Sequence, residues 1–278
     1  MPKQSTHAEL KVQKNVFDKM KERLENNIEI FFVKSDPLTS EQMVDLLEPK
    51  TLLSSDHINA YFSMLNSQQR RDDHIYGLST YFYTRLVSSD NNYEYEAVAR
   101  WTKNTRIFKK KMVFVPINLD QVHWILAVIR IGTREIQIWD SLGHSHHKDS
   151  VGTWLNKYLK DEYDHKENNV NNHNLKDEDT KDKNENSIRT IGAQGENIIE
   201  WKDFEVVDKW VQERGPQTDG ASCGVFVCLI AKLLTDGKTE EQIKEIIFEK
   251  DAAYNYRKVM TLEICNYAID NNTVTSTE

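Results

Sequence analysis

Three consecutive apolar runs, rich in β-branched residues, place the tightest constraint on the fold. They cover residues 112–119, 122–131 and 134–141, and only short turns separate them. Runs of this composition and length are typical of β-strands, and the turn at Gly132 predicts that the second and third pair as an antiparallel hairpin. Pro116 has no N–H to donate, so we expect an edge or bulge position there and an irregular first strand.

Apolar residues at helical spacing predict helices on both sides of these strands. The predicted helices cover residues 7–33, a segment that starts at Thr39 or Ser40, and residues 56–68, 95–107, 151–160, 223–234, 239–250 and 251–269. Residues 75–87 suit either a strand or a buried helix, and a further strand is expected near 204–207. Helices, then a β-meander, then helices again indicate an α+β fold with a central mixed or antiparallel sheet flanked by helices.

One segment is too polar to contribute to a core. Residues 161–197 contain almost no apolar side chain, so burial cannot offset the conformational entropy lost on ordering them. Core-like sequence resumes on both sides, and we therefore expect a disordered, low-complexity insertion within one domain. The chain then divides into a helical extension, residues 1–36, and a main domain, residues 37–278.

The net charge of −8 and the three cysteines restrict partners and location. Nucleic acid is not an expected partner, because phosphate binding depends on clustered Lys and Arg, although a basic patch ends at Lys109, Lys110 and Lys111. No apolar run reaches the roughly 18 residues of a membrane span, and no signal peptide is evident. Three cysteines form no disulfide framework. We expect a soluble protein of the nucleus or cytoplasm, or an effector secreted into a host cell.

The segment between Pro216 and Leu234 contains a candidate nucleophile. Cys223 stands between Ser222 and Gly224 and begins an apolar run of helical length. Unpaired N–H groups at a helix N-terminus favour the thiolate over the thiol. A free Cys is also a residue that proteins bury for packing alone, so a catalytic interpretation requires a His and an orienting partner elsewhere.

The second and third β-runs supply those partners. If the hairpin turns at Gly132 and Thr133, the numbers of facing residues sum to about 265, which places Asp140 opposite Ile125. Asp140 then lies within hydrogen-bonding reach of His123. A carboxylate in that place fixes the imidazole tautomer, and the imidazole accepts the proton of the thiol. A His inside a strand is also commonly a structural residue.

Gln217 is a candidate for stabilising negative charge. It lies six residues before Cys223 in a Gly-containing loop. Its side-chain amide and the backbone N–H of Cys223 would supply two donors to the oxyanion that forms when a carbonyl is attacked.

These residues resemble the signature of the ubiquitin-like-protein-specific cysteine proteases, the Ulp or sentrin-protease group. The similar segments are VHWILAVI, IQIWDSLG and QTDGASCGVFVC, with His, Asp, Gln and Cys in the family's order. The resemblance implies a papain-like fold whose catalytic order is reversed from that of papain. It implies catalytic roles for His123, Asp140, Gln217 and Cys223, and makes residues 37–278 an Ulp-like protease domain.

The resemblance also implies substrate-binding residues. The segment SSDHINAYF, which contains Asp56, is similar to the one that packs beside the family's substrate channel. Trp124 would roof a narrow tunnel for a Gly-Gly tail. Leu53 stands where many members have Trp, and Ser222 and Asp219 replace the common Asp and Asn before the nucleophile. These departures leave the choice of modifier open.

The function implied by the resemblance is cleavage after the C-terminal Gly-Gly of SUMO, in precursors or conjugates. One alternative keeps the chemistry and changes the modifier to ubiquitin or another ubiquitin-like protein. A second is acetyl transfer through Cys223, against which Trp124 argues. No cofactor and no metal are expected: His144, His146 and His147 lack a Cys pair at zinc-finger spacing, so a solvated loop explains them.

Overall fold

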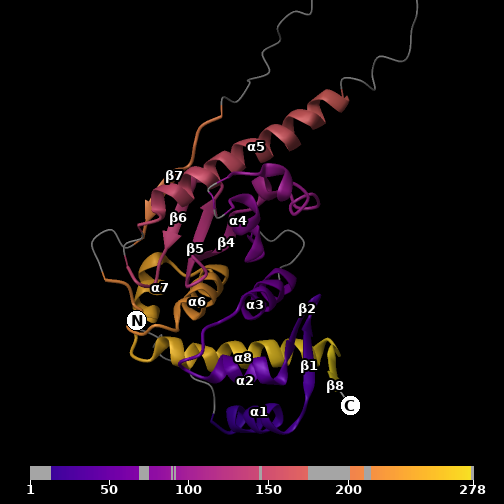
Figure 1. Cartoon of the computed structure of the whole chain (residues 1–278), viewed down its shortest axis with the longest axis vertical. Coiled ribbons are helices and arrows are strands. Elements are labelled where there is room, and N and C mark those ends of the chain that lie inside the picture. The colour runs from indigo at the N-terminus through magenta and orange to yellow at the C-terminus, as the bar shows by residue number, and fades with distance from the viewer. Residues whose placement is uncertain are drawn as a thin grey trace, which may run out of the picture.

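A five-stranded sheet forms the centre of the protein (Figure 1). The computed structural model describes residues 14–68, 75–88, 90, 92–143, 146–174, 201–209 and 214–276. The sheet has the order β3-β4-β5-β6-β7. Its strands are β3 (Ile75–Gly77), β4 (Met112–Leu119), β5 (His123–Arg130), β6 (Glu135–Trp139) and β7 (Glu205–Asp208). The three middle strands are antiparallel, and β3 and β7 pair in parallel at the two edges.

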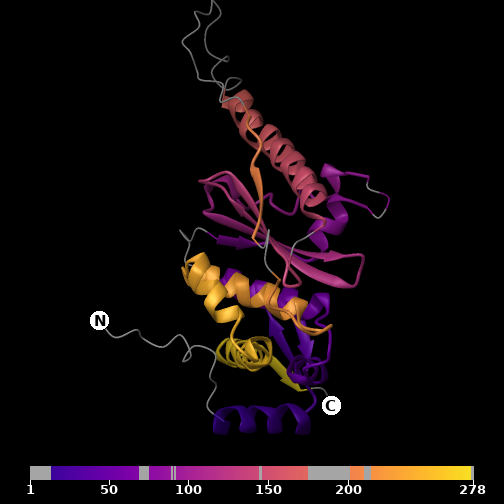
Figure 2. The ribbon, with the colours of Figure 1, turned by 90° about the vertical axis from the view of Figure 1, so that its left-hand side faces the viewer.

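Each face of this sheet covers its own core because side chains alternate along a strand. Even-numbered side chains of β4 and β5, such as Phe114 and Leu126, pack with α3 (Ser55–Gln68) and α6 (Cys223–Thr235). Odd-numbered ones, such as Val115 and Ala127, join a second core. That core includes side chains of α4 (Tyr81–Leu86) and α5 (Lys148–Asn174). Figure 2 shows α6 between the sheet and the C-terminal helix.

A smaller three-stranded sheet with order β2-β1-β8 lies beyond α3 and α6 (Figure 1). Its strands are β1 (Glu29–Val33), β2 (Asp36–Thr39) and β8 (Val274–Ser276). The remaining helices are α1 (Lys14–Asn26), α2 (Ser40–Leu47), α7 (Glu240–Ile247) and α8 (Ala252–Asp270). Both α2 and α7 begin with the capping box that the Thr-x-x-Gln pattern produces. The fold is α+β, as predicted.

The register of the β5–β6 hairpin confirms the sequence prediction. Leu126 pairs with Trp139 and Ile129 with Ile136, and both pairs satisfy the predicted sum. The prediction for Pro116 is correct in one respect. Because β3 ends at Gly77, opposite Phe114, Pro116 lies where β4 is locally an edge. The β4–β5 register nevertheless continues without interruption through Pro116, so the predicted irregularity is wrong.

Three helix or disorder predictions are wrong for the described residues. Of the first predicted helix, residues 7–13 lie outside the described residues, 14–26 are helical, and 29–33 form β1 instead. Residues 29–33 are a strand because β2 and β8 complete their backbone hydrogen bonds. Residues 95–107 hold short 3₁₀ turns at Tyr95–Ala97 and Ile107–Lys109 rather than a helix.

The predicted disorder from residue 161 is the third error, because α5 continues to Asn174. Residues 175–197 of the predicted insertion lie outside the described residues. The run 75–87 contains both a strand and a helix. The division at residues 36 and 37 stays a prediction, and the β1–β2 hairpin crosses it. In the described part of the chain, no helix combines the length and apolarity needed to cross a bilayer.

Candidate active site

Cys223 is the first residue of α6, as the sequence predicts. Its side chain is 2% exposed. The next residue, Gly224, allows α6 to approach the sheet closely: a Cβ at this position would lie 2.9 Å from Cβ of Leu53 and 3.3 Å from Cδ1 of Trp124. A larger residue at 224 would therefore displace either Cys223 or its surroundings.

The loop before Cys223 is braced by one carboxylate. Asp219 Oδ1 accepts the backbone N–H groups of Ala221 at 2.7 Å and Ser222 at 2.8 Å. Its other oxygen accepts the hydroxyl of Ser222 at 2.9 Å. Asp side chains form such local bonds readily, and here they fix the backbone that leads into α6. Asp219 and Ser222, the two residues that depart from the family pattern, are therefore hydrogen-bonded to each other.

His123 and Asp140 are in direct contact. His123 Nε2 lies 2.7 Å from Asp140 Oδ1, and the side chains are 17% and 8% exposed. The same carboxylate oxygen accepts the backbone N–H of Leu142 at 3.0 Å, so the turn after β6 fixes its position. Because Nε2 is occupied by Asp140, Nδ1 is the imidazole nitrogen left for the thiol of Cys223.

Electrostatics couple His123 to Cys223. Burial lowers the pKa of His123, but hydrogen bonds to Asp140 and Cys223, with the charges of both groups, raise it to about 9. Burial raises the pKa of Cys223. The hydrogen bond from His123 and backbone hydrogen bonds from Trp124 and Gly224 outweigh burial, so the pKa of Cys223 falls below its ordinary value. Both shifts favour a thiolate paired with an imidazolium.

Gln217 is buried beside this site but is held by other groups. Its Oε1 accepts the hydroxyl of Ser141 at 2.6 Å, and its Nε2 donates to the carbonyl of Asp219 at 2.7 Å. Its backbone N–H donates to the carbonyl of Ser141 at 2.9 Å. One N–H of the amide remains for a ligand. The oxyanion role of Gln217 therefore stays a prediction, with an orientation set by Ser141.

The predicted substrate-binding residues fall into two environments. Trp124 is 5% exposed, and its indole N–H donates to the carbonyl of Leu53 at 2.9 Å. Leu53 is also buried, so the two form one wall beside Gly224. Asp56 is exposed in the first turn of α3 and accepts a hydrogen bond from Gln42 at 3.2 Å. Asp56 is thus accessible to a partner, whereas Leu53 shapes the wall.

A buried arginine that sequence reasoning missed links the segment before Leu53 to the loop before Cys223. Arg257 of α8 is fully buried. It donates to the carbonyls of Thr51 at 2.7 Å and Ala221 at 3.2 Å through Nη2, and to that of Leu46 at 3.2 Å through Nη1. Arg257 thereby ties the segment before Leu53 to the loop before the nucleophile. An Arg inside a helical pattern carries no signal that could have revealed this.

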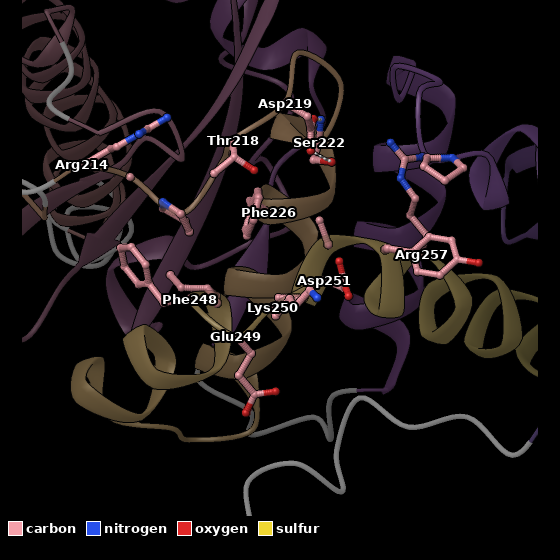
Figure 3. A pocket seen from close by; sticks show the side chains of 17 residues that line it. Arg214, Thr218, Asp219, Ser222, Phe226, Phe248, Glu249, Lys250, Asp251 and Arg257 are labelled. Carbon is pink, nitrogen blue, oxygen red and sulfur yellow. Dashed lines mark hydrogen bonds between the residues drawn. The ribbon is translucent and has the colours of Figure 1, made fainter.

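A cavity of about 780 Å³ lies beside the loop of residues 214–222 that leads into α6 (Figure 3). Thr218, Asp219 and Ser222 line one side, and the connection from α7 to α8 lines the other. His123, Asp140 and Cys223 are not among its lining residues, so this cavity is separate from the reactive groups.

Across the described residues, no cluster of three or more potential metal ligands occurs; His144 lies outside them.

A nucleophilic Cys at a helix N-terminus, a His and a carboxylate that orients it define the class of cysteine hydrolases. The chain belongs to the Ulp1 protease family. The model of that family's C-terminal catalytic domain matches residues 51–271. Members of this family are cysteine peptidases.

Curated relatives and solved structures agree with this assignment. Sentrin-specific protease 2 of Rattus norvegicus is 27% identical over 214 residues, which cover 76% of this chain and 29% of that protein. Putative ubiquitin-like-specific protease 1B of Arabidopsis thaliana is 29% identical over 68% of this chain and 48% of that protein. The chain thus spans less than half the length of these two relatives.

Two solved structures share the fold. One is the SUMO protease Ulp1 with its catalytic cysteine oxidised to a sulfenic acid, at 21% identity and a TM-score of 0.66. The match covers 93% of this chain and 97% of the Ulp1 chain. The other is the C-terminal Ulp1 protease domain in complex with SMT3, the yeast ortholog of SUMO. It has 22% identity, a TM-score of 0.65 and the same coverage.

Proposed function

We propose that this chain is a thiol isopeptidase that cleaves after the C-terminal Gly-Gly of SUMO, in precursors or conjugates. The observation that carries the proposal is the contact of His123 with Asp140 and with a Cys223 whose pKa is lowered. Family membership supplies the reaction class. The proposal for the modifier rests on the relatives that are SUMO or sentrin proteases.

The proposed reaction uses the charged pair directly. The thiolate of Cys223 attacks the carbonyl carbon of the terminal glycine, and the oxygen becomes an oxyanion. The backbone N–H of Cys223 and the free N–H of Gln217 donate to it. When the C–N bond breaks, the imidazolium of His123 gives its proton to the departing amine, leaving a thioester. His123 then takes one proton from water as the resulting hydroxide attacks the thioester carbonyl. The C–S bond breaks, which regenerates the Cys223 thiolate and the His123 imidazolium and releases the modifier as a carboxylic acid that loses its proton to the solvent.

We propose that the substrate has no side chains next to the scissile bond. Trp124 and Leu53 make a continuous wall against Gly224, and we assign the Gly-Gly tail to the space along that wall. Asp56, exposed on α3, is proposed to contact the folded body of the modifier. We place the enzyme in the nucleus or cytoplasm, where a reducing environment preserves the free cysteines Cys223, Cys228 and Cys265.

A set of electrophilic probes tests the proposal. SUMO and ubiquitin, each carrying a C-terminal propargyl group, are incubated with wild-type protein and with Cys223→Ala, and adducts are read by intact mass. The expected result is an adduct with the SUMO probe that is absent from Cys223→Ala. Labelling by the ubiquitin probe alone would show that SUMO is not the modifier and would favour the alternative substrate, ubiquitin. No labelling, together with consumption of acetyl-CoA, would instead favour acetyl transfer.

A further inference from the structure

A cationic cavity lies at the end of the sheet away from Cys223. Its volume is about 600 Å³, and it is formed by the segment before β4 and by α5. The lining residues are Tyr95, Ala99, Lys103, Thr105, Arg106, Ile107, Phe108, Lys109, His165 and Lys166. Four of these are Lys or Arg and none is acidic, although the whole chain has a net charge of −8. The cavity therefore has a local charge opposite to that of the protein.

Three of the four cations are available to a ligand. Lys103, Arg106 and Lys109 are exposed, and none of the three side chains forms an ion pair with another described residue. Lys166 differs, because it pairs with the buried Glu162 and donates to the carbonyl of Thr102. The mouth of the cavity thus offers three positive charges that no carboxylate of the described residues pairs with.

The wall of the cavity is aromatic. The rings of Tyr95 and His165 lie 4.6 Å apart, and Phe108 contacts the rings of Tyr163 at 5.7 Å and Trp201 at 6.4 Å. The aromatic rings that make these contacts come from three segments: the residues before β4, α5, and the residues before β7. A ligand that carries a flat or apolar group between negative charges would satisfy both the wall and the rim.

The surroundings limit the length and kind of the anion. Glu96 Oε1 lies 3.9 Å from His165 Nε2, and Asp161 and Asp164 precede His165 on α5. Acidic side chains therefore adjoin the cavity and limit the extent of its positive charge. A nucleic acid needs a longer basic track for its phosphates. The free cations are exposed rather than buried, which suits the carboxylates of a peptide better than a tightly enclosed phosphate.

We propose that this cavity binds a short acidic peptide segment of a protein partner, with an aromatic side chain against Phe108 and Tyr95. The cavity and His123 lie at opposite ends of β4, whose eight residues span about 23 Å. A peptide bound there leaves the catalytic groups free. Resting on the proposed function, the partner is the protein to which the modifier is attached, and the cavity is a second site of this enzyme that binds that target.

The test measures binding to catalytically inactive protein, so it does not depend on turnover. A fluorescent peptide with one phenylalanine between two runs of glutamates is titrated by anisotropy into Cys223→Ala at low ionic strength. The same background carries either Lys103→Glu, Arg106→Glu and Lys109→Glu or the control set Lys14→Glu, Lys19→Glu and Lys34→Glu. All six lysines and arginines are exposed, and both sets change the net charge equally.

We expect the cavity set to weaken peptide binding by about tenfold or more and the control set by about twofold or less. Equal losses in both sets would overturn the proposal, because only bulk charge would matter. Tighter binding of single-stranded DNA than of the peptide would also overturn it, as would full competition by equimolar inorganic phosphate. If peptide binding follows the expected pattern but modifier probes fail to label Cys223, the proposed function fails and the cavity assignment stands.

Discussion

Asp140 Oδ1 lies 2.7 Å from Nε2 of His123 and 3.0 Å from the backbone nitrogen of Leu142. The hydrogen bond from Leu142 fixes the carboxylate, and the carboxylate in turn fixes the imidazole with its other nitrogen toward Cys223. The hairpin register delivers this geometry, since β5 and β6 pair up to Trp139 and Asp140 is the next residue. The β5–β6 hairpin therefore sets the orientation of the His123 imidazole.

Asp140→Asn should move the alkaline limb of activity to lower pH. Burial lowers the pKa of His123, and Asp140 is the principal group that raises it, with Cys223, to about 9. The imidazolium is the form that protonates the leaving amine, so activity is lost as pH rises through this pKa. Without the carboxylate we expect the limb to shift down by about one unit or more. The measurement is kcat/KM against pH on a fluorogenic modifier substrate; an unchanged limb would assign it to another group.

Gln217→Ala should reduce kcat by about two to three orders of magnitude, the usual cost of losing an oxyanion donor. Ser141→Ala should give a smaller reduction in the same parameter, because Ser141 orients Gln217 through its Oε1. KM should change little in both. A double variant no slower than Gln217→Ala would confirm that Ser141 acts through Gln217, whereas multiplicative losses would show that it acts independently.

Arg257→Met should destabilise the fold by about 3 kcal/mol, because it leaves the carbonyls of Leu46, Thr51 and Ala221 without the donors of a buried guanidinium. Urea unfolding measures this, with Lys258→Met as a control on the next residue of α8. Below the unfolding transition, Arg257→Met should also lower kcat/KM, with partial rescue by Arg257→Lys. Equal free energies of unfolding for the Arg257 and Lys258 variants would show that the hydrogen bonds of Arg257 do not stabilise the fold.

Glu162→Ala should cost about 2–4 kcal/mol, because Tyr95 and Thr102 would lose a shared buried acceptor. Tyr95 Oη lies 2.6 Å from Glu162 Oε2, and Thr102 Oγ1 lies 2.5 Å from Glu162 Oε1. Asp164→Ala, two residues later on α5, should cost less than about 1 kcal/mol, because Asp164 is 42% exposed. Similar thermal unfolding of both variants would show that this stretch of α5 contributes little.

The sequence predicted the parts of the site that depend on local pattern. The hairpin register followed from a two-residue turn and uniform strands, and the position of Cys223 followed from the apolar run after it. The bracing by Arg257 was not predictable, because its three acceptors are backbone carbonyls more than 35 residues away.

Errors occurred where distant partners decide the structure. Residues 29–33 have an apolar pattern that suits a helix, but β8, at the other end of the chain, supplies their strand partner. Composition predicted disorder from residue 161. Glu162 is nevertheless fully buried, and its carboxylate accepts hydrogen bonds from the hydroxyl groups of Tyr95 and Thr102. Hydropathy cannot reveal a polar residue that is buried among matched hydroxyl groups.

The pH dependence of Cys223 alkylation measures whether Cys223 and His123 form a thiolate–imidazolium pair. Wild-type protein and His123→Ala are treated with iodoacetamide over a range of pH, and modification of Cys223 is followed by peptide mass spectrometry. Cys228 and Cys265, whose burial raises their pKa, serve as internal controls. We predict that wild-type Cys223 reacts well below the ordinary pKa of a thiol, and that His123→Ala shifts its profile to markedly higher pH. Identical profiles for the two proteins would contradict the thiolate–imidazolium pair.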